Sequence, residues 1–408
     1  MFDKEILRKF ADLVLSIGVN LQKGQGLELA CPVEKREVAE AFTEVAYSHG
    51  AKIVRIRWED EVIDKINYSC ADEQTLCEIP KWYVDSKNYL MEKNFCYVAI
   101  AADDPSIFKD IPSDKIAAVA KARSQALKKF SDCVMANGIR WCVVSVPTPS
   151  WAKQVFPDAK NAEELLAKAI IKTMRLDKDN PTLEWKKHIE TLDKRAEFLN
   201  KHAFSYLKFK SKNGTDLLVG LADEHVWLSA KEKAKDGVSF VANMPTEEVF
   251  TAPHKDRVDG VLYSSMPLCE NGQIIDDFKI TFKKGKIVDF SAKKGYATLK
   301  NLIETDQGTR RLGEVALIGK NSPIAESKIL FFNTLFDENA SCHLAIGKAY
   351  PTNIKNGENL SKKELKDLGA NDSIEHVDFM IGTNDLSVIG VKKNGEEIRL
   401  FNDGEWII

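Results

Sequence analysis

The chain reads NTLFDENASCHLAIGKAY from Asn333 to Tyr350. This short stretch places Asp337, Glu338, His343 and Tyr350 among small and apolar residues. Carboxylate and imidazole groups are ligands that zinc, manganese and cobalt take from proteins, and carboxylates also offset the charge of the cation. The stretch therefore indicates a metal site, around which the second half of the chain would fold.

Three other segments of the second half carry similar groups. If HVD forms a strand, His376 and Asp378 share one face, because side chains alternate along a strand. Glu247 and Glu248 lie in TEEVFT, and Glu314 ends RRLGE. Each segment alone is weak evidence, since a histidine among apolar residues is more often a hydrogen-bonded core residue and paired glutamates usually face solvent. The prediction rests on several carboxylates and two histidines in settings where an unpaired charge is costly.

Length and composition set the broad class of the protein. A chain of 408 residues is long enough for two domains. Its net charge of −3 and pI near 6.2 give no electrostatic reason to expect nucleic acid or an anionic membrane as a partner. No apolar run approaches the roughly 20 residues that span a bilayer. Eight scattered cysteines without a C-x-x-C pair indicate reduced thiols, and the charged amphipathic start differs from a signal peptide, so we expect a cytoplasmic protein.

The first half alternates between apolar runs and helical patterns, which predicts a mainly parallel sheet covered by helices. Strands are expected at 27–31, 52–58, 95–101 and 141–146, and helices at 6–17, 38–46 and 113–135. Neither G-x-G-x-x-G nor G-x-x-x-x-G-K-[ST] occurs, so a nucleotide site has no positive support. The helical, charge-rich region 161–199 is expected to hold the joint, with an α/β domain at 1–195.

After residue 204 the pattern changes to short strands and turns. Strand pairs joined by Lys284-Gly285 and Asn394-Gly395 are typical of hairpins. We therefore predict a mainly antiparallel, β-rich domain at 196–408 that carries the metal site.

The donor set exceeds the needs of a single ion. A single catalytic zinc usually takes three protein ligands and leaves one position for water. Two divalent ions about 3.5–4 Å apart would use the larger set, and hydrolysis is the natural use because metal binding lowers the pKa of water towards ~7. Redox chemistry is the main competitor, since His343, His376 and Asp378 could form the facial triad of a ferrous oxygenase. A ferrous facial triad would leave three further carboxylates around the site without a role.

Four segments carry a resemblance to a known family. They are NMPTEEVFTAPHKDRVDG (243–260), RRLGEVAL (310–317), the stretch 333–350 and HVDFMIG (376–382). Together they resemble the thermophilic-type metalloaminopeptidases, the aminopeptidase T and aminopeptidase S group, over essentially the whole chain. The resemblance implies that the metal ligands are Glu248, Glu314, Glu338, His343, Tyr350, His376 and Asp378. It also implies two divalent ions per chain (zinc, cobalt, manganese or magnesium), a homodimer and a cytoplasmic location.

The resemblance further implies an exopeptidase that acts on peptides with a free amino terminus. Such an enzyme must bind an α-ammonium group, for which Glu247 is a candidate, although this glutamate could equally face solvent. His254 and Lys255 are candidates to stabilise an oxyanion or a peptide carboxylate, or could form a basic loop. Tyr350 could bind metal, donate a hydrogen bond to the oxyanion, or only pack. The alternative from another class is a non-catalytic, metal-dependent peptide-binding protein on the same fold.

Overall fold

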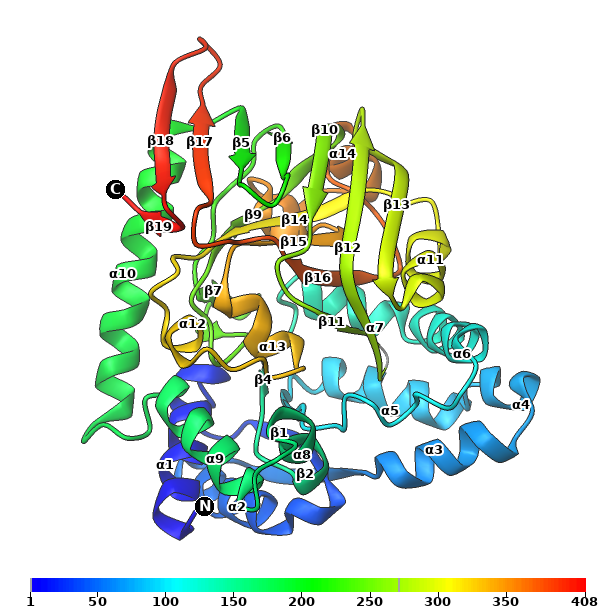
Figure 1. Ribbon diagram of the computed structural model, residues 1–408. Coiled ribbons are helices and arrows are strands. Elements are labelled where there is room, and N and C mark those ends of the chain that lie inside the picture. Colours follow the sequence, from blue (N-terminus) through cyan, green and yellow to red (C-terminus); the bar gives the residue numbers. More distant parts are fainter. Residues whose placement is uncertain (1, 271) are drawn as a thin grey trace. The chain divides into compact units, whose positions relative to one another are not determined.

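The computed structural model describes residues 2–270 and 272–408 (Figure 1). The chain forms two compact units, the first made of residues 1–190 with 230–246 and the second of residues 191–229 with 247–408. The expected division at residue 195 into two independently folding domains stays a prediction.

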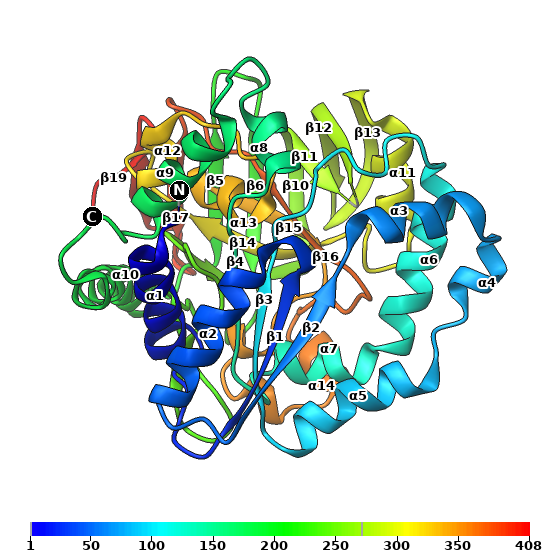
Figure 2. The ribbon, with the colours of Figure 1, turned by 90° about the horizontal axis from the view of Figure 1, so that it is seen from below.

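The first unit is built on a four-stranded parallel sheet of order β2-β1-β3-β4 (Figure 2). Its strands are β1 (Gly26–Pro32), β2 (Ile53–Glu59), β3 (Cys96–Ile100) and β4 (Trp141–Val144), and a separate small hairpin is formed by β7 (Lys231–Lys233) and β8 (Ser239–Val241). Its helices are α1 (Lys4–Leu13), α2 (Arg36–Ser48), α3 (Glu61–Cys70), α4 (Glu73–Cys77), α5 (Lys81–Glu92), α6 (Ser113–Ala126), α7 (Lys128–Met135), α8 (Pro149–Val155) and α9 (Ala162–Thr173). The α/β class with a mainly parallel sheet is thus confirmed for the first half.

Two local expectations in this unit were incomplete. The helix expected over 113–135 is divided into α6 and α7, because the backbone of Leu127 leaves the helical region at φ −92° and ψ 7°. Helices α3 and α4 were not expected from the sequence. Neither helix contains a buried residue, and the apolar side chains of α3, which are Val62, Ile63 and Ile66, are exposed.

The main charged groups against the parallel sheet are paired. Glu28 of β1 accepts a hydrogen bond from Lys87 of α5 at 2.8 Å, and Lys87 is only 3% exposed. Arg57 of β2 donates to Tyr97 of β3 at 2.8 Å and pairs with Glu59. Each cation here has an anion as neighbour, which is how charged groups are tolerated in a low-dielectric interior.

The second unit is mainly antiparallel, as the turn-rich sequence predicted. Helix α10 (Pro181–His202) leads into it, with a proline at its first position, where no backbone N–H is needed. Its larger sheet has the order β11-β12-β10-β6-β5-β17-β18-β19, and β13 pairs with β12. These strands are β5 (Tyr206–Lys210), β6 (Asp216–Leu221), β10 (Pro253–Tyr263), β11 (Leu268–Glu270), β12 (Gln273–Lys283), β13 (Lys286–Lys294), β17 (Ser387–Val391), β18 (Glu397–Asn402) and β19 (Glu405–Trp406).

A smaller sheet of the second unit has the order β16-β15-β14-β9, and all its pairs are antiparallel (Figure 1). Its strands are β9 (Val249–Thr251), β14 (Leu312–Leu317), β15 (His343–Gly347) and β16 (His376–Met380), and the helices of this unit are α11 (Tyr296–Glu304), α12 (Pro323–Ser327), α13 (Thr334–Asp337) and α14 (Lys362–Asp367). Every residue of β9, β14 and β15 is buried. No helix in the described part of the chain is both long and apolar enough to span a bilayer.

Candidate metal centre

The strand register places the predicted donors on one face of the small sheet. Ala345 of β15 lies opposite Glu314 on one side and opposite Asp378 on the other. His343 and His376 lie two residues from Ala345 and Asp378 along their own strands, so both point to the same face. The small side chain of Ala345 leaves space between the two carboxylates.

A bulge in β14 turns Glu314 onto this face. Leu312 pairs with Ile346 but Glu314 pairs with Ala345, so three residues of β14 lie opposite two of β15. Without the extra residue, Glu314 would point to the opposite face of the sheet, as Leu312 does. Gly313 fits the bulge because a Cβ atom there would lie 2.3 Å from the carbonyl oxygen of Lys348.

Both histidines are oriented by backbone carbonyl groups. Nδ1–H of His343 donates to the carbonyl oxygen of Glu338 at 2.9 Å, and Nδ1–H of His376 donates to that of Lys348 at 2.6 Å. Each ring therefore presents Nε2 to the carboxylates, which is the arrangement of metal-ligating histidines.

The donor atoms form two overlapping groups. Nε2 of His343 lies 3.1 Å from Oε2 of Glu248 and 3.5 Å from Oε1 of Glu314. Nε2 of His376 lies 3.6 Å from Oε2 of Glu314 and 3.5 Å from Oδ2 of Asp378. Ligand atoms within each group lie within 4.8 Å of one another, and Glu314 belongs to both. The two histidines fall into different groups, whereas the facial triad of a ferrous oxygenase needs both on one ion.

Glu338 is held beside these groups by the turn that follows α13. Its Oε1 accepts a hydrogen bond from Nδ2 of Asn339 at 3.3 Å. Asp337 stabilises the same turn, because its two oxygens accept from the backbone N–H groups of Phe331 at 2.8 Å and Asn333 at 3.0 Å. Neighbouring acidic residues thus have separate tasks, one within the donor cluster and one in the fold of the turn.

The cluster carries more negative charge than its buried surroundings favour. Burial, together with the charges of Asp378 and Glu248, raises the pKa of Glu314 to about 7 against the opposing hydrogen bond from His343. Burial, Asp378 and Glu248 also raise the pKa of Glu338 well above its usual range. Burial lowers the pKa of His376, but Asp378 and Glu314 outweigh it and raise the value to about 9. Protons therefore supply positive charge that a bound cation would otherwise supply.

One buried oxygen points to a missing partner. Oδ1 of Asp378 is inaccessible to solvent and has no hydrogen bond among residues 2–270 and 272–408. A buried carboxylate oxygen without a donor is costly unless it coordinates a metal. The donor set, its net negative charge and the orientation of the two imidazoles therefore fit a divalent cation.

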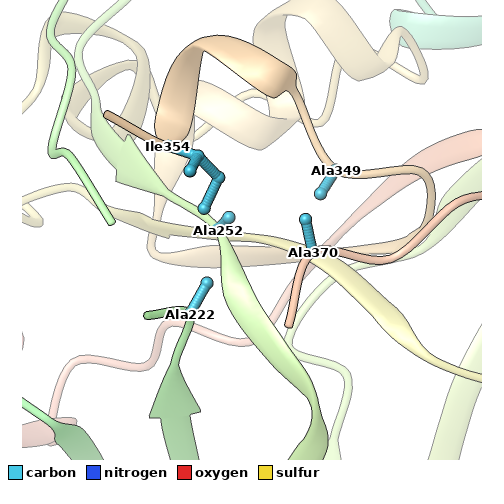
Figure 3. Close-up of a cluster of buried hydrophobic side chains, with 5 residues drawn as sticks. All are labelled: Ala222, Ala252, Ala349, Ile354 and Ala370. Carbon is cyan, nitrogen blue, oxygen red and sulfur yellow. The ribbon is translucent and has the colours of Figure 1, made fainter. Parts of the chain in front are cut away.

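Tyr350 lies next to the cluster. Its ring packs edge-on against the ring of His376, with centroids 4.8 Å apart. The segment that carries Tyr350 is fixed by a cluster of small buried residues (Figure 3): Ala222, Ala252, Ala349, Ile354 and Ala370. Because four of these side chains are single methyl groups, the segments approach closely and leave the tyrosine little freedom to move away.

The other two candidate site residues, Glu247 and His254, lie in different surroundings. Glu247 is 6% exposed, its N–H donates to Oδ1 of Asn339 at 2.7 Å, and its charge acts on Arg195. His254 lies on β10 against Gly369, where burial and then Arg257 lower its pKa. The charged groups that act on His254 come from β10 and from Asp223 rather than from the donor cluster.

The two arginines of RRLGE pair with carboxylates. Arg311 contacts Oδ1 of Asp256 at 2.6 Å and the carbonyl oxygen of Lys255, while Arg310 lies 3.3 Å from Oε1 of Glu304. The lysine beside His254 likewise pairs with Asp256. The contacts of Arg311 therefore fasten β10 to the segment that leads into β14, whereas Arg310 contacts α11.

Known proteins of similar sequence and fold indicate the family of this chain. The model of the thermophilic metalloprotease (M29) family matches residues 3–406. The chain belongs to this family. It is 44% identical to Aminopeptidase 2 of Geobacillus stearothermophilus, over 99% of this chain and 98% of that protein, and 41% identical to Aminopeptidase AmpS of Bacillus subtilis, over 98% of each. The solved structure of wild-type AmpT from Thermus thermophilus is 34% identical, covers all of both chains and has a TM-score of 0.91.

Membership of the M29 family confirms the resemblance inferred from the sequence motifs, and the fold agrees with that of the solved relative. Sequence reasoning missed Asn339, which is fully buried and links Glu247 to Glu338 through the hydrogen bonds given above. An asparagine directly after the DE pair, in an otherwise apolar setting, is the signal that could have revealed it.

Proposed function

We propose that this chain is an aminopeptidase that removes the amino-terminal residue of peptides with the help of two divalent metal ions. The observation that carries the proposal is the sharing of Glu314 between two donor groups. A carboxylate placed to bridge two ions, with one histidine on each side, is the arrangement expected of paired metals in hydrolases.

The proposed ligands divide between two positions. One ion would be held by Glu248, Glu314 and His343, and the other by Glu314, His376 and Asp378. Glu338 and Tyr350 would complete the set. When bound, the ions would polarise the scissile carbonyl group and activate a water molecule.

The chain's own residues would bind and orient the peptide. Glu247 would hold the α-ammonium group of the substrate; a buried carboxylate directly before a proposed ligand supports this role. Tyr350, beside His376, would act in one of two ways: as a phenolate ligand of an ion, or as a phenol that donates a hydrogen bond to the oxyanion that develops on the carbonyl oxygen. His254 of β10 would bind the carboxylate of the peptide or stabilise the oxyanion.

The substrate class is supported by the relatives. Both sequence relatives described above are named aminopeptidases and match this chain over nearly its full length. A homodimer and a cytoplasmic location are proposed on the family resemblance alone. The identities of the ions, among zinc, cobalt, manganese and magnesium, are part of the same proposal.

An assay with blocked and free substrates tests the proposed function. The protein should lose activity on aminoacyl-anilides after dialysis against a chelator and regain it with one of the four metals. N-acetylated versions of the same anilides should stay intact. Tight binding of metal and peptide without any cleavage would support the non-catalytic alternative, and cleavage of blocked substrates would contradict end recognition.

A further inference from the structure

A cavity of about 330 Å³ lies in the second unit outside the proposed metal ligands. It is formed where the residues that follow β14, those that precede β15 and the loop after β16 meet. Ala340, Ser341 and Cys342 line it, and they stand between Glu338 and His343 in the sequence. Its volume is at the lower end of the range for ligand pockets, which is about 300–1,000 Å³.

The cavity has apolar walls. Ile318, Ile324, Cys342 and Leu386 line it, and each is at most 2% exposed. The buried side chain of Cys342 behaves as a small apolar group. The walls therefore favour an aliphatic group over a strongly hydrated ion.

The polar groups of the cavity are cationic or neutral. Lys320 and Lys328 line it, while no Asp or Glu does among the described lining residues. Ser265, Ser341, Thr383 and Asn384 add neutral polar groups to the lining. Two lysines without a carboxylate in the lining favour an anionic ligand.

Two carboxylates that neighbour lining residues in the sequence accept hydrogen bonds from other groups. Asp385 accepts hydrogen bonds from Oγ1 of Thr383 at 2.8 Å and from the N–H of Lys212 at 2.7 Å. Glu405 accepts from the N–H groups of Asn321 and Trp406, both at 3.0 Å. These acids serve to fix the loops around the cavity.

We propose that this cavity binds a small aliphatic carboxylate whose charge is met by Lys320 and Lys328 and whose aliphatic part packs against the apolar walls. Inorganic phosphate matches the charge but leaves the apolar walls in contact with water. A free amino acid brings an α-ammonium group next to two lysines. The carboxyl end of a peptide and a free aliphatic acid both have the required chemistry.

Calorimetric titration of the metal-loaded protein tests the proposal with defined probes. N-acetyl-leucine and 4-methylpentanoate should bind, while the neutral N-acetyl-leucinamide and inorganic phosphate should bind much more weakly. Stronger binding of N-acetyl-leucine identifies a peptide end as the ligand, and stronger binding of 4-methylpentanoate identifies a free acid. Binding of N-acetyl-leucinamide as tight as that of N-acetyl-leucine overturns the proposal, as does the failure of both carboxylates to bind.

Two substitutions locate the binding. Lys320→Met keeps the aliphatic length of a half-buried lysine and should weaken binding by about tenfold, the cost typical of losing a charged hydrogen bond. Lys328→Asn, at a residue with φ of 55° where asparagine is tolerated, should weaken it about threefold because Lys328 is exposed. Lys363→Gln, an exposed lysine of α14, is the matched control and should have no effect. If both folded variants bind like the wild type, the ligand sits elsewhere and the proposal is wrong.

Discussion

The two four-stranded sheets of this chain differ in how the charged side chains beside them are arranged. Against the parallel sheet of the first unit, Glu28 meets Lys87 and Arg57 meets Glu59, so each charge is balanced by one of opposite sign. On the β16-β15-β14-β9 sheet, Glu248, Glu314, Glu338 and Asp378 gather around His343 and His376, and both histidine pKa values are raised. The first pattern stabilises a fold without further partners. The second gathers like charges in a buried setting, where added positive charge is stabilising, and such perturbed groups are typical of functional sites.

The largest effect should come from removing the shared carboxylate. Glu314→Gln takes a donor from both groups, and even the loss of groups that merely orient ligands typically costs ~10–100-fold. We expect metal affinity and kcat/KM to fall by more than about 100-fold while the fold is retained. Metal analysis and steady-state kinetics on the purified variant measure both quantities. A variant with wild-type metal content would remove Glu314 from the centre.

A substitution beside the parallel sheet should have the opposite result, which is a loss of stability without a loss of metal. Glu28→Gln leaves the Lys87 ammonium buried without its partner, which typically costs about 3 kcal/mol of unfolding free energy. Metal content and kcat of the folded fraction should not change. Chemical denaturation, followed by metal analysis, gives the comparison with Glu314→Gln. Loss of metal from Glu28→Gln without loss of stability would break the contrast between the two sheets.

Tyr350→Phe is a smaller test of the same contrast. It keeps the ring that packs against His376 and removes only the hydroxyl group. We expect kcat to fall by on the order of 100-fold, the cost typical of losing one oxyanion donor. Unchanged metal content would assign Tyr350 to hydrogen bonding, and reduced content would assign it to the ligands. Wild-type kinetics would place the residue in packing alone.

The last effect builds up gradually with pH and is the smallest when it is counted per pH unit and per proton. In the protein without metal, Glu314 has a pKa of about 7 and His376 of about 9, so both hold protons at lower pH. A metal must displace these protons, and therefore its affinity should rise with pH, by about tenfold per unit for each proton displaced. Calorimetric titrations from about pH 6 to about pH 9 measure the slope. An affinity that is independent of pH would show that the metal binds without these two residues.

Much of this architecture can be predicted from the sequence, and the exceptions have physical causes. The alternation of apolar runs predicted the parallel sheet, and the i, i+2 spacing of His376 and Asp378 predicted a shared face. The face of Glu314 could not be predicted, because it depends on a bulge at Gly313 that no periodic pattern records. The orientation of the histidines was hidden as well, since it depends on carbonyl groups of distant residues such as Lys348.

The number of bound metal ions tests the central claim most directly. Chelator-treated protein, titrated with zinc or manganese and then analysed by mass spectrometry of its metals, should take up two ions per chain, and Glu314→Gln should lose both. Activity should return as the ions bind. Full activity in metal-free protein, or saturation at one ion per chain with normal activity, would contradict the account of a shared carboxylate between two metals.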